Sequence, residues 1–286
     1  MRVLITGASG QLGQDLQRAF HDDDSRRRHE LIACDHRTLD VADRDNVLQV
    51  ITTTQPDAVV HAGAWTAVDA CEGDPQRAFA VNALGTRWVA EGARLVGARV
   101  CYVSTDYVFD GTLDRPYHEW DDPNPMSVYG RSKLGGEREL GDDATVVRAS
   151  WVCGVHGSNM VKTALRLSRE RDELAFVDDQ RGCPTFTEDL AGMIRRLVVA
   201  RVPGLFHVTN QGETTWFQFV RDVFTAAGLD PDRVKPIRTQ DLDPPRPAPR
   251  PANSVLDNMA LRGAGIPLLP DHHEPLERAV KELLQS

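Results

Sequence analysis

Tyr129 and Lys133 are the two residues whose types and spacing most directly suggest chemistry. They lie in a helix-forming run that extends to Leu140, and residues four apart on a helix project from the same face. A phenol has a pKa of about 10 in water and is a poor proton donor near neutral pH, but a nearby ammonium lowers that pKa. Such a pair could act as a general acid that interconverts a ketone and an alcohol. A surface Tyr and Lys one turn apart would show the same spacing.

A glycine-rich turn near the N-terminus predicts a dinucleotide site. Val3–Thr6 is a short apolar run typical of a buried strand, and an amphipathic stretch to Phe20 follows the turn. Glycine permits close approach of the backbone to a pyrophosphate, and the start of a helix offers free N–H groups. A purely structural turn is the alternative. The candidate cofactor contacts in this G-x-x-G-x-x-G stretch are Gly7, Gly10, Gln11, Leu12 and Gly13.

The next predicted strand, Glu30–Cys34, ends at Asp35. A carboxylate about 20 residues after the glycines suits the ribose 2′-hydroxyl of NADH. Arg37 follows closely and could instead pair with the 2′-phosphate of NADPH, so both cofactors remain open. Asp40 and Val41 are candidate contacts to the adenine, or loop residues without a ligand.

A third predicted strand, Ala58–His61, is followed by small residues that include Gly63 and Ala64. Small residues at the carboxyl end of a strand let a flat ligand lie against the backbone, which is where open α/β sheets bind ligands. Trp65 could form a wall beside a nicotinamide or a substrate, or could simply pack.

Two more predicted strands end in polar or aromatic side chains. Arg99–Val103 leads to Thr105 and Asp106, and Thr145–Ala149 leads to Trp151. Because parallel strands end at a common edge, these residues are expected near the cofactor site.

Strand and helix alternate over the first 150 residues, which predicts an α/β fold with a parallel sheet and helices on both faces. We assign residues 1–150 to a doubly wound, Rossmann-type NAD(P)-binding domain that also receives segments from 174–200. Residues 151–286 form mainly a smaller, substrate-binding lobe. The proline-rich stretch 231–251 is predicted to be an extended loop.

Composition limits the partners and the location. The net charge of −9, with acidic and basic residues interspersed, argues against nucleic acid as a partner. The five cysteines are scattered without a CxxC pair, so neither a disulfide framework nor a zinc site is predicted. The apolar run at the N-terminus is too short for a signal peptide and no segment could span a membrane, so a cytoplasmic protein is expected.

These motifs resemble the extended short-chain dehydrogenase/reductase superfamily and, within it, the dTDP-4-dehydrorhamnose reductase family. The similar stretches span most of the chain: Gly10–Gly13, Ala64–Asp69, Ser104–Phe109, Val128–Leu134, Asp179–Thr185 and Arg250–Ser254. The resemblance implies NAD(P)H-dependent reduction of a 4-keto sugar nucleotide to dTDP-L-rhamnose. The sequence departs from the family at Gly63, Trp65 and Cys183, which leaves the reaction type unaffected.

The resemblance also implies roles for individual residues. Tyr129 would donate the proton, and Lys133 would lower its pKa and hold the nicotinamide ribose. Thr105 would hydrogen-bond to the 4-keto oxygen, and Asp106 and Trp151 would contact the sugar.

Charged residues of the proline-rich stretch are candidates for the substrate phosphates. Arg246 and Arg250 could supply local positive charge there, or could be solvated arginines of a structural loop.

Some relatives in this reductase family resemble one another in holding Mg²⁺ between subunits with three carboxylates. The matching positions are Asp15, Glu188 and Glu282, and Mg²⁺ prefers oxygen ligands. A monomer or a Mg²⁺-linked homodimer is therefore expected. The helix dipole alone could also explain Asp15 and Glu188.

Two rival functions remain at this point. The chain could be a 4-keto reductase for another dTDP-deoxysugar, for example in antibiotic glycosylation. It could also be a non-catalytic, nucleotide-binding regulatory subunit of the same fold, although Thr105, Tyr129 and Lys133 are all present.

Overall fold

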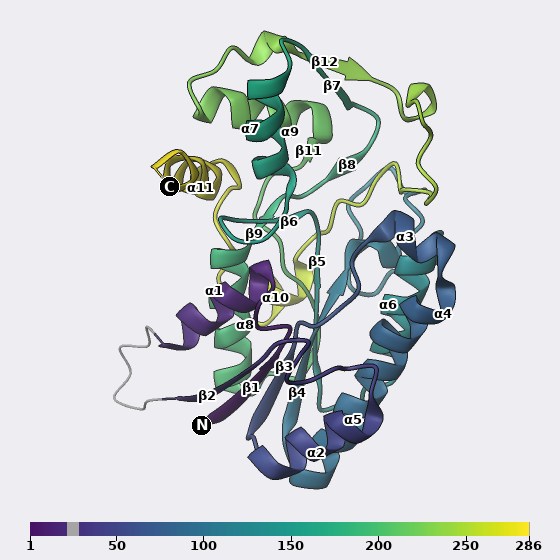
Figure 1. The fold of residues 1–286 in the computed structure, drawn as a ribbon, viewed down its shortest axis with the longest axis vertical. Coiled ribbons are helices and arrows are strands. Elements are labelled where there is room, and N and C mark those ends of the chain that lie inside the picture. The colour runs from purple at the N-terminus through teal and green to yellow at the C-terminus, as the bar shows by residue number, and fades with distance from the viewer. Residues whose placement is uncertain (22–28, 286) are drawn as a thin grey trace.

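A six-stranded parallel sheet is the centre of the molecule (Figure 1). The computed structural model describes residues 1–21 and 29–285. The sequence between His21 and His29 is polar and charged, which predicts a loop, and most of it lies outside the described residues. The strands occur in the order β10-β5-β4-β3-β1-β2. Their bounds are β1 Arg2–Thr6, β2 Glu30–Cys34, β3 Ala58–His61, β4 Arg99–Thr105, β5 Thr145–Ala149 and β10 Gly204–His207.

Helices cover both faces of this sheet (Figure 1), which confirms the predicted fold class. On one face, Leu16 and Ile194 pack on Ile5 in a fully buried cluster. On the other face, Ile51 and Val89 pack in a second cluster. The helices of the first face are α1 Gln11–His21 and α8 Thr187–Ala200, and those of the second are α2 Arg44–Thr54, α5 Gly85–Val96 and α6 Val128–Glu137.

Two strand predictions are confirmed to the residue, and capping side chains fix two helix starts. Strands β2 and β3 have the predicted bounds. Asp43 caps α2, because its carboxylate accepts a hydrogen bond from the backbone N–H of Asn46 at 3.1 Å. Thr215 likewise caps the helix that begins at Trp216, accepting from Gln218 N at 3.2 Å.

The chain winds outward from β1 in both directions, to β2 on one side and through β3, β4 and β5 on the other. The point where the strand order reverses lies between β1 and β3, and such switch points are where open α/β sheets bind ligands. The turns after β1 and β3 therefore determine where a cofactor can lie.

The second half of the chain builds its own hydrophobic cluster above the sheet, with Phe219, Phe224, Leu165 and Leu276 buried in it. It also returns to the sheet, because α8 packs against α1 and β10 pairs with β5. Its elements are β6 Val152–Cys153, α7 Met160–Glu170, β7 Leu174–Val177, β8 Arg181–Gly182, β9 Thr185–Phe186, β11 Thr214–Thr215, α9 Trp216–Ala226, β12 Val234–Ile237, α10 Met259–Gly263 and α11 His273–Gln285.

The prediction of one extended loop over 231–251 is wrong in its first part. A 3₁₀ turn, Pro231–Arg233, is followed by β12, which pairs in parallel with β7 and places Pro236 opposite Phe176. Proline cannot donate to a strand ladder, but in a two-stranded sheet every strand has a free edge. The missing N–H can therefore face away from the partner strand.

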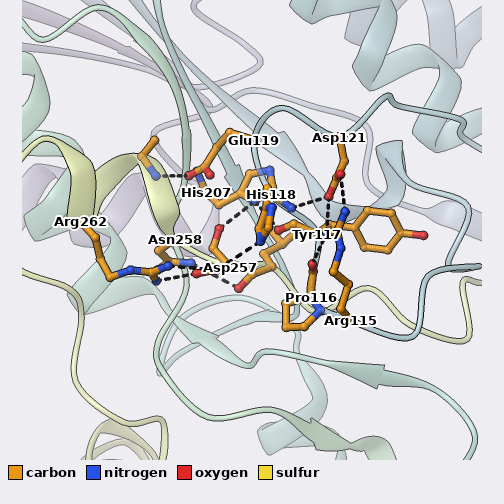
Figure 2. Close-up of polar contacts among 12 residues, drawn as sticks. Arg115, Pro116, Tyr117, His118, Glu119, Asp121, His207, Asp257, Asn258 and Arg262 are labelled. Atoms are coloured by element: carbon orange, nitrogen blue, oxygen red, sulfur yellow. Dashed lines mark hydrogen bonds and ion pairs between the residues drawn. The ribbon is translucent and has the colours of Figure 1, made fainter.

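Figure 2 shows a polar network that fixes the segment between β4 and α6. Glu119 Oε1 accepts hydrogen bonds from the backbone N–H groups of His207 at 2.9 Å and Ala260 at 3.1 Å. The Nδ1 of His207 lies 3.2 Å from the carbonyl oxygen of Tyr117 and 3.1 Å from that of Asp257. Since this segment leads directly into α6, the network fixes the approach to the helix that carries Tyr129.

None of the helices in the described part of the chain combines the length and the apolar character needed to cross a membrane.

Candidate active site

A cavity of about 460 Å³ lies at the carboxyl ends of β1, β3, β4 and β5. It extends from the glycine turn to α6 and α9, and its size is typical of a small-molecule site. Eleven of the residues predicted from the sequence line it: Gly7, Gly10, Gln11, Leu12, Gly13, Ala64, Thr105, Asp106, Tyr129, Lys133 and Trp151.

The glycine turn is packed so closely that larger residues would not fit. Gly7 has a φ of +66°, and a Cβ there would lie 2.8 Å from the Cα of Gly63. A Cβ on Gly13 would lie 2.2 Å from the carbonyl oxygen of Gly7. These contacts hold the start of α1 against the end of β1, so the first N–H groups of the helix are presented at the switch point.

Tyr129 lies at the start of α6, where Ser127 caps the helix by accepting from Gly130 N at 3.0 Å. The phenol is 8% exposed, and burial raises its pKa, while a hydrogen bond with Thr105 opposes that shift. Thr105 donates to Asp106 Oδ1 at 3.0 Å. Burial raises the pKa of Asp106 to about 6, and its Oδ2 has no hydrogen-bond partner among the described residues.

Lys133 faces the same cavity from the next turn of α6. Its Nζ donates to the carbonyl oxygen of Val103 at 2.6 Å and lies 4.1 Å from the centroid of the Tyr102 ring. Burial lowers its pKa to about 7, and Glu137 opposes this. The ammonium is thus hydrogen-bonded to the backbone of β4, and burial raises the pKa of Tyr129, opposite to the lowering that the spacing suggested.

A buried ion pair behind the cavity was not predicted. Arg148 on β5 binds Glu137 on α6 with Nη2–Oε2 and Nε–Oε1 distances of 2.6 and 2.9 Å. The two side chains are only 3% and 9% exposed, and Ser104 on β4 donates to the same carboxylate. The pair joins two strands to the helix that bears Tyr129. In the sequence, Glu137 lies four residues after Lys133 and therefore on the same face of the helix, which was the available signal that this carboxylate belongs near the site.

Asn82 is a second positioning residue, and its contacts explain why an amide lies among apolar residues. It sits in a π-helical turn, Ala80–Leu84, between α4 (Pro75–Phe79) and α5. Its Oδ1 accepts from the backbone N–H of Trp65 at 2.8 Å. Its Nδ2 donates to the carbonyl oxygen of Trp65 and to Ser132 Oγ, at 3.1 and 2.9 Å. Asn82 thus joins the loop after β3 to α6.

Two tryptophans form an aromatic wall on the side of the second half. Trp151 stacks on Trp216 with ring centroids 3.6 Å apart and an interplanar angle of 8°, and both line the cavity. Trp151 has a φ of +46°, an uncommon value for a bulky residue that redirects its ring. Trp216 was not predicted, because it lies 65 positions after Trp151 and only the folded chain brings them together.

The residues predicted to select the cofactor lie outside the cavity lining, at the end of β2. Asp35 Oδ1 accepts from Arg37 N, Thr38 N and Thr38 Oγ1 at 3.0, 2.9 and 2.9 Å. The hydrogen bonds from Thr38 lower the pKa of this carboxyl, which is therefore ionised at neutral pH. Arg37 is exposed, whereas Val41 is buried against Gly85. Asp40 Oδ1 accepts from the backbone of the following turn at 3.0 Å.

Trp65 and Gly63 also lie outside the lining, although their neighbour Ala64 belongs to it. Gly63 N donates to Thr6 Oγ1 at 3.1 Å, which ties the turns after β1 and β3 together. The Trp65 ring packs against the guanidinium of Arg77, 4.6 Å from the ring centroid.

Arg246 and Arg250 converge on Asp69, which lies in α3 (Val68–Gly73). Arg250 makes two contacts of 2.8 Å with the carboxylate and is largely buried, whereas Arg246 is 3.4 Å away and mostly exposed. Neither arginine lines the cavity, but the side chain of Arg250 hydrogen-bonds to Tyr107, which does.

The three carboxylates expected to hold Mg²⁺ line one separate cavity of about 360 Å³. Arg278 lies there as well, 3.4 Å from Glu188. Asp15 is almost fully buried and lies 3.7 Å from Arg18. Within residues 1–21 and 29–285, three potential ligand atoms come within 4.8 Å of one another only in a different place, so Asp15, Glu188 and Glu282 do not converge. The residues present do not fit the expected ion, because the three carboxylates do not converge and Arg278 already contacts one of them.

The Rossmann sheet, the glycine turn at its switch point and the Tyr129–Lys133 cleft are those of an NAD(P)-dependent oxidoreductase of the short-chain dehydrogenase/reductase class. The model of the family described as "RmlD substrate binding domain" matches residues 1–285, and the chain belongs to this family. The resemblance inferred from the sequence is thereby confirmed.

Curated relatives and a solved structure agree with this membership. A dTDP-4-dehydrorhamnose reductase of Streptomyces griseus is 40% identical over 93% of this chain and 88% of its own. A dTDP-4-keto-6-deoxy-D-glucose reductase of Streptomyces niveus is 38% identical over 93% of this chain and 91% of its own. The crystal structure of a Bacillus anthracis dTDP-4-dehydrorhamnose reductase in complex with NADP superposes with a TM-score of 0.92 at 38% identity, covering 98% of this chain and 99% of that one.

Proposed function

We propose that this chain reduces the 4-keto group of dTDP-4-dehydro-L-rhamnose to give dTDP-L-rhamnose, with NADPH or NADH as the reductant. The observation that carries the proposal is that Thr105, Tyr129 and Lys133 meet the glycine turn in one cavity. Relatives named as reductases of this substrate, 40% and 39% identical, match 93% and 98% of the chain.

The cofactor fits the glycine turn. Gly7 and Gly13 carry no side chains, and none would fit there. A pyrophosphate can therefore approach the N–H groups at the start of α1. A bound reduced nicotinamide supplies the hydride. Asp35 and Arg37 would contact the ribose end of the cofactor, with Asp40 and Val41 nearby. Ala64 lines the cavity on the other side of the switch point, and Gly63 lies behind it against Thr6.

Proton transfer to the substrate oxygen is assigned to Tyr129. Its hydroxyl is a neutral donor at pH 7, since burial raises its pKa. Thr105 already hydrogen-bonds to Tyr129 and would place the carbonyl oxygen within reach of the phenol. Asp106 accepts a hydrogen bond from the Thr105 hydroxyl, which would turn from Asp106 to the carbonyl oxygen when the substrate binds.

Lys133 is assigned two tasks, to hold the nicotinamide ribose and to favour the phenolate that forms when Tyr129 gives up its proton. Its ammonium is bonded to Val103 O, so it is held at the cavity wall between β4 and α6. Glu137 and Arg148 hold the helix that carries it.

The sugar nucleotide would lie against the Trp151–Trp216 wall, with Asp106 at the sugar. Arg250 and Arg246 are the proposed contacts to the diphosphate. Their shared partner Asp69 would keep them oriented until the phosphates arrive. We assign no role to Mg²⁺, because Arg278 occupies the carboxylate cavity. We place the reaction in the cytoplasm, because all five cysteines are buried free thiols.

The test is an assay in which dTDP-4-dehydro-L-rhamnose is generated in situ and the nicotinamide absorbance is followed, with NADPH and NADH in parallel. We expect consumption of cofactor and a product that co-migrates with dTDP-L-rhamnose. Cofactor binding without any turnover of this or another 4-keto sugar nucleotide would contradict the proposal and favour a regulatory subunit.

A second substrate is favoured by one specific comparison. The Streptomyces niveus relative, 38% identical, is named for reduction of dTDP-4-keto-6-deoxy-D-glucose. Comparing kcat/KM for the two 4-keto sugars would decide between them, because both reactions use the same donor and cofactor.

A further inference from the structure

A second group of chemically active side chains lies away from the cavity, where α9 meets α11 (Figure 1). We propose that Asp222, His272 and His273 form a binding site for a divalent transition-metal ion such as Zn²⁺. Asp222 belongs to α9, His273 is the first residue of α11, and His272 precedes it. We refer to these three residues as the α9–α11 cluster.

The cluster has the spacing of a metal site. One potential ligand atom from each residue lies within 4.8 Å of the other two, the only such set in the described residues. The Nε2 of His273 lies 3.6 Å from Oδ2 of Asp222. Two ligands at the usual bond length of about 2.0–2.2 Å from a tetrahedral ion are roughly 3.4 Å apart. The His273 ring is exposed, so a small rotation can bring its Nε2 to the distance that a shared ion requires.

His272 gives an independent indication of a ligand. Its side chain is 1% exposed, and its Nε2 has no hydrogen-bond partner among the described residues. An unpaired polar atom at this depth is costly unless something binds it. Its Nδ1 lies 3.2 Å from the carbonyl oxygen of Gln211, which fixes the tautomer with the lone pair on Nε2.

His273 and Asp222 are each also held by a hydrogen bond through the atom that is not offered to the metal. His273 Nδ1 lies 2.6 Å from Oδ1 of Asp271, and Asp222 Oδ1 accepts from Gln218 at 2.8 Å. Metal-binding histidines commonly donate their second N–H to a carboxylate or a backbone carbonyl in this way. The bridge between Gln211 and Asp271 fixes the backbone on which both histidines stand.

An ion can reach the cluster, because Asp222 and His273 line an open cavity of about 640 Å³. Two imidazoles and one carboxylate suit Zn²⁺, Co²⁺ or Ni²⁺, whereas Mg²⁺ prefers oxygen ligands alone. The cysteine pattern predicted no zinc site, and the buried cysteines take no part in this one. The ion would join α11 to α9, the helix that also begins with Trp216 at the active-site wall.

The test is calorimetric titration of tag-free protein with ZnCl₂, CoCl₂ and MgCl₂, with the thermal midpoint measured in parallel. We expect one equivalent of Zn²⁺ and of Co²⁺, a higher midpoint with either ion, and no binding of Mg²⁺ at this site. Asp222→Asn and His272→Gln should weaken Zn²⁺ binding at least tenfold. His118→Gln is the matched control, because that histidine also lies beside an aspartate, 3.5 Å from Asp257, but is outside the cluster.

Asp222→Asn carries the test if His272→Gln fails to fold, because Asp222 faces the open cavity. Zn²⁺ affinity that is unchanged in both Asp222→Asn and His273→Gln would overturn the proposal. So would thiolate bands in the Co²⁺ spectrum, or no measurable Zn²⁺ binding by the wild-type chain. Loss of binding in His118→Gln equal to that in Asp222→Asn would also overturn it, since it would mean nonspecific surface binding.

Discussion

Buried ionisable side chains govern the chemistry of the cleft. Burial raises the pKa of Tyr129 and lowers that of Lys133 to about 7, so both groups are held close to their neutral forms. A phenol of raised pKa is a weak acid in the free protein. The proton transfer proposed here therefore depends on a nearby positive charge that favours the phenolate, which is the role proposed for Lys133.

Tyr129→Phe removes the proposed proton donor but keeps the ring that packs beside Tyr107. We expect kcat to fall by roughly 10²-fold or more while the cofactor dissociation constant stays within a factor of about two, because the hydroxyl acts in the transition state. Steady-state kinetics and fluorescence titration with NADPH measure the two quantities. Near-normal turnover would show that another group protonates the product.

The pH profile of kcat/KM should report Lys133. Its folded pKa of about 7 is depressed from 10.5, so the ammonium is present below pH 7 and is lost as the pH rises. We expect kcat/KM to decline above about pH 7 in the wild-type chain and the Lys133→Met variant to be slow without this limb.

The titration of Lys133 also affects the stability of the fold, which should rise with pH where kcat/KM falls. Between pH 7 and 10.5 the unfolded chain binds the lysine proton more tightly than the folded chain does. The contribution of Lys133 therefore favours the fold increasingly as the pH rises through this window.

A wild-type chain whose kcat/KM is flat from pH 6 to 9 would contradict the assignment of Lys133.

Cofactor choice is expected to depend on Arg37, which is exposed beside the ionised Asp35. We expect the wild-type chain to use both cofactors, with a preference below roughly 10³-fold, because the carboxylate suits a 2′-hydroxyl and the guanidinium a 2′-phosphate. Arg37→Ala should raise the KM for NADPH roughly tenfold or more and leave that for NADH unchanged. Equal effects on both cofactors would place Arg37 away from the ribose.

At the level of elements, α6 is held to β4 and β5 by polar groups as well as by apolar packing. The Glu137–Arg148 pair is nearly inaccessible to solvent, so removing one partner leaves an uncompensated charge. Glu137→Gln should lower the free energy of unfolding by about 3–5 kcal/mol, measured by urea denaturation at pH 7.5.

The double variant Glu137→Gln/Arg148→Met is the control, since it removes both charges and should recover part of the loss. Glu137 also opposes the lowering of the Lys133 pKa, so the single variant should move the decline of kcat/KM to lower pH. A single variant as stable as the wild-type chain would show that the pair contributes little.

For the molecule as a whole, the carboxylate cavity that includes Glu188 bears on assembly. Because Arg278 already pairs with Glu188 there, we expect the mass measured by light scattering to be the same in MgCl₂ and in EDTA at several protein concentrations. Arg278→Ala removes this internal cation and is the informative comparison. A mass that doubles with Mg²⁺ in the wild-type chain would restore the metal-linked dimer as an explanation.

Local signals in the sequence gave much of the fold. Strands β2 and β3 were predicted to the residue, because apolar runs act over a few positions. Strand β12 was missed, because its proline signalled a loop and its partner β7 lies about 60 residues earlier. A strand of this kind is defined by its partner and not by its own composition.

The sequence by itself determined the alternation of strand and helix, the glycine turn and the Tyr129–Lys133 spacing, since each depends on residues close together in the chain. Only the tertiary structure decided which distant groups meet. It stacked Trp216 on Trp151, paired Arg148 with Glu137, directed Lys133 to Val103 O and put Arg278 among the acidic side chains where a metal was expected. The same long-range packing brought Asp222 to two histidines. Burial and pairing set the charge state of such groups, and both arise only when remote segments pack together.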